Sequence, residues 1–206
     1  MNTSKKIWLV DLDGTLYRPG LVKWAMALEL LLFGWAALSI IRTFRKTHEE
    51  IRSESEADPK RRFFPSPFDE QIRRTASRSG SSESRVRRVV NTWMFQKPGK
   101  WLRLSLRTEL IKEIEAHRAS GGKTALVTDY PAEKKLQAMG LSYLFDHVIA
   151  CGETSALERL KPAPDSIQAA LKSAGVDADD ALMIGDRIDA DGAAAKAAGV
   201  EFRHIQ

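Results

Sequence analysis

Two carboxylates lie two residues apart near the N-terminus, Asp11 and Asp13, within the segment Asp-Leu-Asp-Gly-Thr-Leu. They stand where the short apolar run from Ile7 to Leu12, which predicts a buried strand, gives way to a loop. Gly14 allows the backbone to turn sharply over both side chains. Two acids in this arrangement suit a metal ion and a nucleophile, although the same residue types also form ordinary strand-ending turns.

Four more residues with useful chemistry follow later in the chain. Thr128 closes a second apolar run, Lys161 lies in the loop 160–164, and Asp186 and Asp191 follow Gly185. Each has a structural explanation of its own: a β-branched strand residue, a solvated lysine, a turn former and an acid at a helix N-terminus. Their order at successive strand ends nevertheless favours one shared site.

Strands and helices alternate through most of the chain. The sequence predicts strands at residues 7–12, 123–128, 147–150, 181–185 and 201–205. It predicts helices at 104–119, 132–139, 166–174 and 192–198, each with a glycine one or two residues beyond its end. This alternation predicts an α/β fold with a Rossmann-like parallel sheet and helices on both faces, and ligands of such sheets bind beyond the carboxyl ends of the strands.

Residues 17–105 differ from the rest, because they show helical patterns and no convincing strand. We therefore expect two domains, a core formed by residues 1–16 and 106–206 and an α-helical cap inserted at 17–105. The run 24–41 carries a single charge, Glu29, and is long enough to span a membrane. A span there would place Asp11 and Lys161 on opposite sides, so we expect a helix buried within the cap against a neighbouring helix, or at a homodimer contact. A membrane-interfacial helix is the alternative.

Composition and charge limit the class of protein. The 206 residues are 43% hydrophobic and 29% charged, as in ordinary globular proteins, and the net charge is +5. Residues 20–105 hold 17 Lys and Arg against 9 Asp and Glu, a net +8, so the remainder carries −3. Cys151 is the single cysteine and cannot form an internal disulfide, and the N-terminal apolar run is too short for a secretory signal. We expect a cytoplasmic protein.

The basic residues of the insertion have several interpretations. The pairs Arg61-Arg62, Arg73-Arg74 and Arg87-Arg88, with aromatic residues nearby, could bind nucleic acid, but no nucleic-acid motif is present. We expect the aromatic residues to form the cap's own core. Some arginines of the cap are expected near the active-site mouth, where they would favour anionic phosphomonoesters. In the membrane-interfacial alternative, headgroups would meet basic residues near the apolar run: Lys23, Arg42, Arg45 and Lys46.

These motifs together resemble those of the haloacid dehalogenase (HAD) superfamily. The matching features are Asp-Leu-Asp-Gly-Thr-Leu after the first strand, Thr128 after the second, Lys161-Pro162 before a helix, and Gly185-Asp186 with Asp191. Segments 145–153, 161–167 and 193–200 are similar to the phosphoglycolate-phosphatase-like branch, whose helical cap lies between the first and second motifs. The resemblance covers the whole chain and is specific for the superfamily, but not for a substrate.

The resemblance implies a role for each acid. Asp11 would attack a phosphoryl group to give an aspartyl-phosphate, while Asp13 would protonate the leaving oxygen and then activate water. Mg²⁺ would be held by Asp11, the backbone carbonyl of Asp13, and Asp186, because it prefers oxygen ligands. Asp191 would support the metal site or the lysine, with Asp189 as its substitute.

The remaining roles concern the substrate. Thr128 would hydrogen-bond the phosphoryl oxygens, and Lys161 would pair with Asp11 and the phosphate. Asp129 stands where the family often has asparagine; we place it among the substrate-binding residues at the entrance and assign it no catalytic role.

Asp13 also indicates the reaction class, because dehalogenases of the superfamily lack an acid at this position and phosphatases keep it. We expect a Mg²⁺-dependent phosphatase of a small phosphorylated metabolite. The alternatives are a phosphomutase of a sugar phosphate and a membrane-associated or non-catalytic binding protein on the same scaffold.

Overall fold

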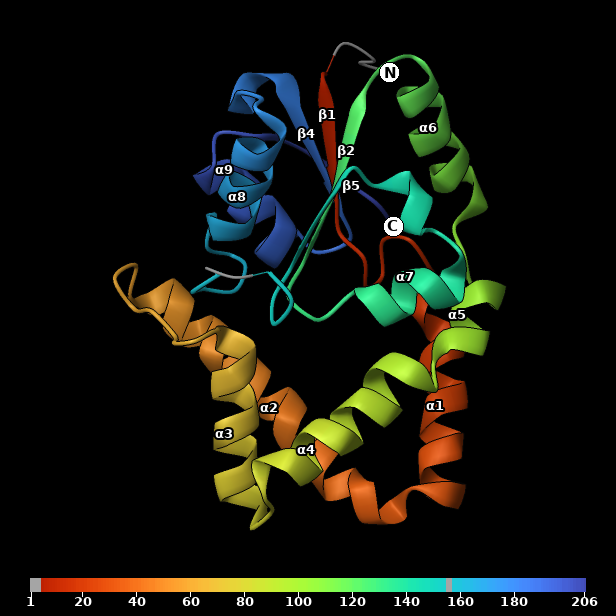
Figure 1. Ribbon diagram of the computed structural model, residues 1–206, viewed down its shortest axis with the longest axis vertical. Helices are drawn as coiled ribbons and strands as arrows, with labels where there is room; N and C mark the ends of the chain where they lie inside the picture. The colour runs from red at the N-terminus through yellow and green to blue at the C-terminus, as the bar shows by residue number, and fades with distance from the viewer. Residues whose placement is uncertain (1–4, 155–156) are drawn as a thin grey trace.

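A five-stranded parallel sheet forms the centre of the computed structural model, which describes residues 5–154 and 157–206 (Figure 1). The strands lie in the order β3-β2-β1-β4-β5. Their bounds are β1 Ile7–Val10, β2 Lys123–Thr128, β3 His147–Ala150, β4 Ala181–Gly185 and β5 Glu201–His204. The predicted strands are confirmed, with β1 and β5 ending slightly earlier. Residues 1–4, which begin the segment judged too short for a secretory signal, lie outside the described residues.

Helices cover both faces of the sheet. The apolar side chains of β1 point alternately to the two faces, so both faces must be buried. Trp8 and Val10 join one apolar cluster, and Ile7 and Leu9 join the other, because successive side chains of a strand point to opposite faces. The first cluster includes residues of α6 (Thr108–Ala119) and α7 (Glu133–Met139). The second includes residues of α8 (Asp165–Ala174) and α9 (Ala193–Ala197). The predicted Rossmann-like α/β core is therefore confirmed.

The four predicted helices differ from the observed ones in their bounds, α7 and α8 by one residue at the start and the other two by more. The helix predicted at 104–119 begins at Thr108, because Leu106 leaves the helical path and forms an isolated antiparallel bridge with Tyr17. The helix predicted at 192–198 is shorter, since a π-helical turn, η4 (Ile188–Gly192), precedes α9. The bridge between Tyr17 and Leu106 holds the two ends of the insertion side by side.

The insertion between β1 and α6 is helical. Its helices are α1 (Pro19–Phe33), α2 (Trp35–Ala57), α3 (Pro67–Ser79), α4 (Glu83–Val90), the π-helical η1 (Asn91–Gln96) and α5 (Gly99–Leu104). Helices α2, α3 and α4 pack around the buried Phe44, Ile72 and Val86. In Figure 1 these helices lie below the carboxyl ends of the strands, and the turn between α1 and α2 lies far from the sheet. The division into two domains stays a prediction.

The apolar run 24–41 does not form one buried helix, so the cap-core interpretation is wrong for its first half. Gly34 separates α1 from α2, and a Cβ at this position would overlap the Trp93 ring. Ile40 and Ile41 in α2 are buried as expected. In the first half, by contrast, the exposed residues include Trp24 at 80% and Phe33 at 75%. The dimer and membrane-interface alternatives stay predictions; within the described residues, no helix is long and apolar enough to cross a membrane.

The aromatic residues of the insertion also differ in part from expectation. Phe63 is buried, but it packs with the sheet cluster that holds Ile7 and Leu9 rather than with the cap. Phe64 is 70% exposed and belongs to no core. Trp93 packs at the edge of the α2–α3–α4 cluster, which agrees with the prediction.

Candidate active site

A buried lysine lies between two buried carboxylates at the carboxyl ends of the strands. Lys161, in the loop before α8, places its Nζ 2.7 Å from Asp11 Oδ1 and 2.6 Å from Asp191 Oδ1. Asp11 follows β1 and Asp191 lies in η4 after β4, so three separate segments meet here. Burial disfavours the charged lysine, but the two carboxylates outweigh that effect and raise the pKa of Lys161 above its ordinary value. Lys161 is therefore a permanent cation at Asp11.

The loop that carries Lys161 is fixed by β2 and by the residue after it. The backbone amide of Lys161 donates to Asp129 Oδ1 at 3.1 Å, and Lys161 Nζ donates to the Val127 carbonyl at 3.3 Å. Asp129 thus lies against the Lys161 loop, and its predicted place at the entrance stays a prediction. Its assignment to substrate binding stays a prediction.

Asp186 lies close to the nucleophile loop because Gly14 has no side chain. Gly14 adopts a φ of +98°, and a Cβ there would overlap the Asp186 carboxylate. Asp11, Asp186 and Asp191 each offer an oxygen within 4.8 Å of the others. Asp186 Oδ1 is buried without a hydrogen-bond partner among the described residues. An unpaired buried oxygen beside two further carboxylates fits a divalent cation, and all-oxygen donors fit Mg²⁺.

The charge of this cluster also fits a cation. Burial raises the pKa of Asp11 to about 8 despite the attraction of Lys161, and the neighbouring Asp191 and Asp13 raise it further. Burial and Asp191 likewise raise the pKa of Asp186. One lysine therefore does not balance the carboxylates, and an added positive charge would stabilise their ionised forms. The predicted metal residues Asp11 and Asp186 are brought together, while the backbone carbonyl of Asp13 as a ligand stays a prediction.

Asp191, rather than Asp189, supports the lysine. Asp191 is 2% exposed, and its second oxygen accepts from the backbone amide of Arg187 at 3.1 Å, which fixes the carboxylate. Asp189 is exposed and pairs with the Arg187 side chain at 2.6 Å. Gly185 leaves room for this arrangement, since a Cβ there would overlap Asp191. The geometry thus favours the support that Asp191 was expected to give.

Asp13 is held by two residues that sequence reasoning missed. Lys135 Nζ donates to its two carboxylate oxygens at 2.5 and 2.7 Å, and the Tyr17 hydroxyl also donates to it. Burial alone would favour the neutral acid, but the charge and hydrogen bonds of Lys135, with the Tyr17 hydroxyl, hold the pKa of Asp13 below its ordinary value. Asp13 is therefore an anion at neutral pH.

A signal for Lys135 was present in the sequence. Leu136 and Met139 form the buried face of α7, and Lys135 lies on that face although it is charged. A charged residue on the buried face of a helix that follows a strand end needs a buried partner, and here the partner is Asp13. Tyr17 gave no comparable signal.

Thr128 ends β2 and is 3% exposed. Its Oγ1 lies 3.5 Å from the backbone amide of Tyr130, at the limit of a hydrogen bond. The hydroxyl is therefore weakly engaged, and its role in binding phosphoryl oxygens stays a prediction.

A cavity of about 710 Å³ extends from this cluster along α1 and α2. Asp13, Asp186, Tyr17 and Lys135 line it next to the cluster, and most of the other lining residues belong to α1, α2 and η1. The remaining basic residues that line it are Lys23, Arg42, Arg45, Arg52 and Arg187.

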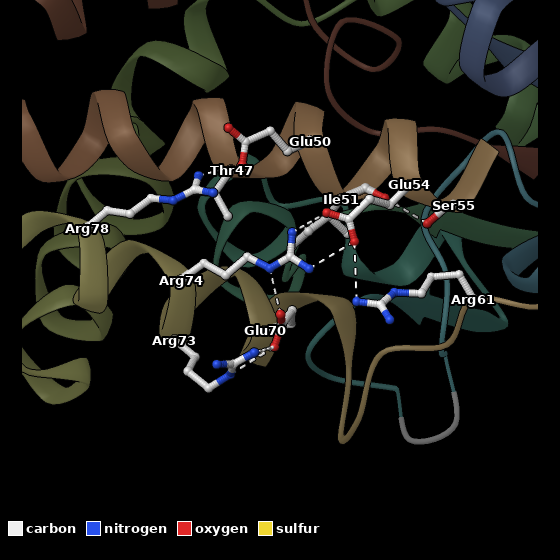
Figure 2. Close-up of polar contacts among 10 residues, drawn as sticks. All are labelled: Thr47, Glu50, Ile51, Glu54, Ser55, Arg61, Glu70, Arg73, Arg74 and Arg78. Carbon is white, nitrogen blue, oxygen red and sulfur yellow. Dashed lines mark hydrogen bonds and ion pairs between the residues drawn. The ribbon is translucent and has the colours of Figure 1, made fainter. Parts of the chain in front are cut away.

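Cap arginines line the cavity as expected, namely Arg42, Arg45 and Arg52, but the paired arginines do not supply this charge. Within the described part of the chain, none of the six lines the cavity. Figure 2 shows why for three of them: Arg74 bridges Glu54 of α2 and Glu70 of α3, Arg73 pairs with Glu70, and Arg61 pairs with Glu54. Arg62 and Arg87 pair with Glu158 and Asp69 in the same way. These arginines join elements of the protein to one another.

Comparison with known proteins identifies the family. The model of the haloacid dehalogenase-like hydrolase family matches residues 5–199, and the chain belongs to this family. It is thus a hydrolase of the HAD superfamily, as its motifs indicated. No curated protein sequence matches the chain.

Solved structures share the fold at low sequence identity. L-2-haloacid dehalogenase from Xanthobacter autotrophicus is 18% identical, with 98% of this chain and 77% of that chain covered and a TM-score of 0.64. A putative HAD hydrolase from Bacillus subtilis, bound to magnesium, is 17% identical, with coverages of 96% and 87% and a TM-score of 0.61. A predicted phosphoglycolate phosphatase from Haemophilus somnus is 19% identical, with coverages of 97% and 84% and a TM-score of 0.55. At these identities the likeness shows the fold alone.

Proposed function

We propose that this hydrolase is a Mg²⁺-dependent phosphatase that cleaves a small phosphomonoester through an aspartyl-phosphate. The observation that carries the proposal is the pair of acids after β1. Asp11 contacts a permanent cation, Lys161, and Asp13 lies two residues further along at the end of the cavity. A nucleophile with a fixed cation and a second acid is what phosphoryl transfer to and from a carboxylate requires.

The reaction has two balanced halves. In the first, an oxygen of Asp11 forms a bond to phosphorus while the bond from phosphorus to the ester oxygen breaks, and a proton from Asp13 leaves with the alcohol. In the second, Asp13 takes a proton from water as the water oxygen attacks phosphorus, which releases phosphate and the Asp11 carboxylate. Lys161 stabilises the charge on the transferring group in both halves.

The state of Asp13 in the free enzyme fits the second half directly, because an anion is ready to act as a base. In the first half Asp13 passes on a proton that it takes up from solvent when the substrate binds, and the proton taken from water in the second half replaces it. The nearest protons belong to the Lys135 ammonium and the Tyr17 hydroxyl, which both donate to its carboxylate. These two residues therefore hold and orient the proton-transfer group.

Asp11, Asp186 and the backbone carbonyl of Asp13 would hold the metal ion, with Asp191 holding Lys161 beside it. When bound, Mg²⁺ supplies positive charge that offsets the repulsion between the carboxylates and the phosphate. The magnesium bound to the structural neighbour from Bacillus subtilis supports this choice.

Carbon–halogen cleavage is the competing reaction, because several structural neighbours are dehalogenases. In a dehalogenase the leaving group is a halide ion, which needs no proton, and the alkyl ester formed on Asp11 is then hydrolysed by water. In a phosphatase the leaving group is an alkoxide, which must be protonated by an acid. The presence of Asp13, held by its own lysine and tyrosine, supports the phosphatase.

The test measures phosphate release from p-nitrophenyl phosphate and chloride release from 2-chloropropionate, with Mg²⁺ and with EDTA. We expect Mg²⁺-dependent phosphate release that Asp11→Asn abolishes and that Asp177→Asn, at an exposed acid outside the site, leaves unchanged. Chloride release without phosphate release would overturn the proposal, as would phosphate release that survives Asp11→Asn. Conversion of a hexose phosphate to its isomer would indicate a mutase instead.

A further inference from the structure

The cavity at the active site has an apolar wall that a small polar substrate would not use. Val22, Met26 and Leu30 of α1 and Leu38 and Ile41 of α2 line it. Its volume of about 710 Å³ lies within the range of about 300–1,000 Å³ typical of ligand pockets. Apolar side chains make up most of the lining surface, although Lys23, Arg42, Arg45 and Arg52 of the same two helices also line the cavity.

The two ends of the cavity therefore differ in chemistry. Asp13, Lys135 and Asp186 lie at the end next to the proposed nucleophile, where a phosphate group would bind. From there, α1 leads away from the sheet (Figure 1). A ligand that matches both parts has a charged head and an apolar chain.

We propose that the substrate is a phosphomonoester with an apolar chain of several carbon atoms, whose phosphate lies at Asp11 and whose chain lies along α1. This inference rests on the proposed phosphatase function and specifies its substrate class. Burial of the chain against α1 and α2 supplies binding free energy at a distance from the reacting phosphorus.

The outer surface of α1 extends this path to the solvent. Leu31 lines the cavity and is also 67% exposed, and its neighbours Leu28 and Leu32 are 58% and 59% exposed. Residues of the same helix thus form one wall of the cavity and an apolar surface beside it. A chain too long for the cavity would continue along this surface.

The experiment compares ethyl, butyl, hexyl and octyl phosphate as substrates, with Mg²⁺ and below the concentrations at which they form micelles. Each methylene group transferred from water into the cavity should raise kcat/KM by about fourfold, the equivalent of ~0.8 kcal/mol. We therefore expect octyl phosphate to exceed ethyl phosphate by at least about 100-fold. Equal kcat/KM values for all four esters would overturn the proposal and leave the phosphatase function intact.

A matched pair of variants on one helix tests where the chain lies. Leu30→Gln places an amide in the cavity wall and should reduce the increase from ethyl to octyl phosphate by about tenfold or more. Leu21→Gln makes the same change on α1 at an exposed residue outside both the cavity lining and the apolar surface of Leu28, Leu31 and Leu32, and it should leave the series unchanged. Equal effects of the two variants would contradict the assignment.

A binding measurement separates this inference from catalysis. Octylphosphonate, which has no ester bond to cleave, should bind the intact protein at least about 100-fold more tightly than ethylphosphonate by calorimetry. Tight binding of octylphosphonate without hydrolysis of any ester would overturn the proposed phosphatase function but would support a ligand with an apolar chain. Hydrolysis of the esters with equal affinities for the two phosphonates would overturn the proposed apolar chain but would support the phosphatase function.

Discussion

Replacement of Lys161 by methionine should destabilise the protein strongly in the absence of Mg²⁺. Lys161 is 3% exposed and lies within 2.7 Å of carboxylate oxygens from two residues, which are themselves 6% and 2% exposed. Methionine fills a similar volume but leaves Asp11 and Asp191 facing one another without a cation. Removal of one partner from a buried ion pair costs about 3–5 kcal/mol, because the remaining charge is unpaired.

The effect should be visible in thermal and urea unfolding. For a chain of this length, each 1 kcal/mol corresponds to about 2–4 °C in Tm, so we expect a decrease of at least about 6 °C. Lys112→Met is the matched control, since Lys112 forms an exposed pair with Glu109 and should contribute less than about 1 kcal/mol. Addition of Asp191→Asn to Lys161→Met should recover at least about 1 kcal/mol, because it removes the charge left unpaired on Asp191.

The pH dependence of the loss provides a further check. Lys161 lowers the pKa of Asp11, which is about 8 in the intact site, so removal of the lysine raises this pKa further. As pH rises through about 8, the folded variant retains a proton on Asp11 that the wild type releases. The variant therefore loses stability relative to the wild type over this range. A loss below about 1 kcal/mol at pH 7, or a loss that shrinks as pH rises through 8, would refute the reasoning.

Three further predictions follow from the site and the cap. Gly14→Ala should abolish phosphatase activity and lower Tm, because its Cβ would overlap Asp186 at a φ of +98°; Gly80→Ala, also at positive φ but with open space around it, should only lower Tm modestly. Asp186→Asn should weaken Mg²⁺ binding by at least about tenfold in calorimetric titration, since it removes one charge from the carboxylate cluster, and an unchanged affinity would place the metal elsewhere. Arg74→Met should reduce the free energy of unfolding by about 1–3 kcal/mol, because Arg74 joins Glu54 to Glu70 (Figure 2), yet should change kcat/KM for p-nitrophenyl phosphate less than twofold. A large decrease in kcat/KM would contradict this expectation and would indicate that the paired arginines act at the active site.

The core could be predicted from the sequence because its signals are local. β1, β2 and β4 are short, largely apolar runs that end at or just before a glycine or polar residue, and three of the five strands have the predicted bounds. Asp11, Lys161, Asp186 and Asp191 converge because parallel strands bring their carboxyl ends to one edge of the sheet.

The cap could not be predicted as well, because its packing depends on partners distant in sequence. The hydropathy of residues 24–41 shows an apolar surface but not what that surface faces, and most of α1 faces a cavity or solvent. Arg73 and Arg74 look like free cations in the sequence, but each has an acidic partner in the fold. Arg73 pairs with Glu70 on the same helix, and Arg74 pairs with Glu54 on the adjacent helix. Lys135 was missed because its partner, Asp13, is 122 residues away in sequence.

The position of β1 in the sheet has a consequence for folding during synthesis. β1 is the central strand, and its neighbours are β2 and β4, with Ile7 paired to Lys123 on one side and to Ala181 on the other. The ribosome thus makes the central strand first and its two neighbours only after the whole insertion has been translated. Until then the apolar Ile7–Val10 segment has no sheet to join, and it is exposed to chaperones and to aggregation. An insertion that folds early would bring Tyr17 close to Leu106 and so shorten the loop that must close before β1 meets β2.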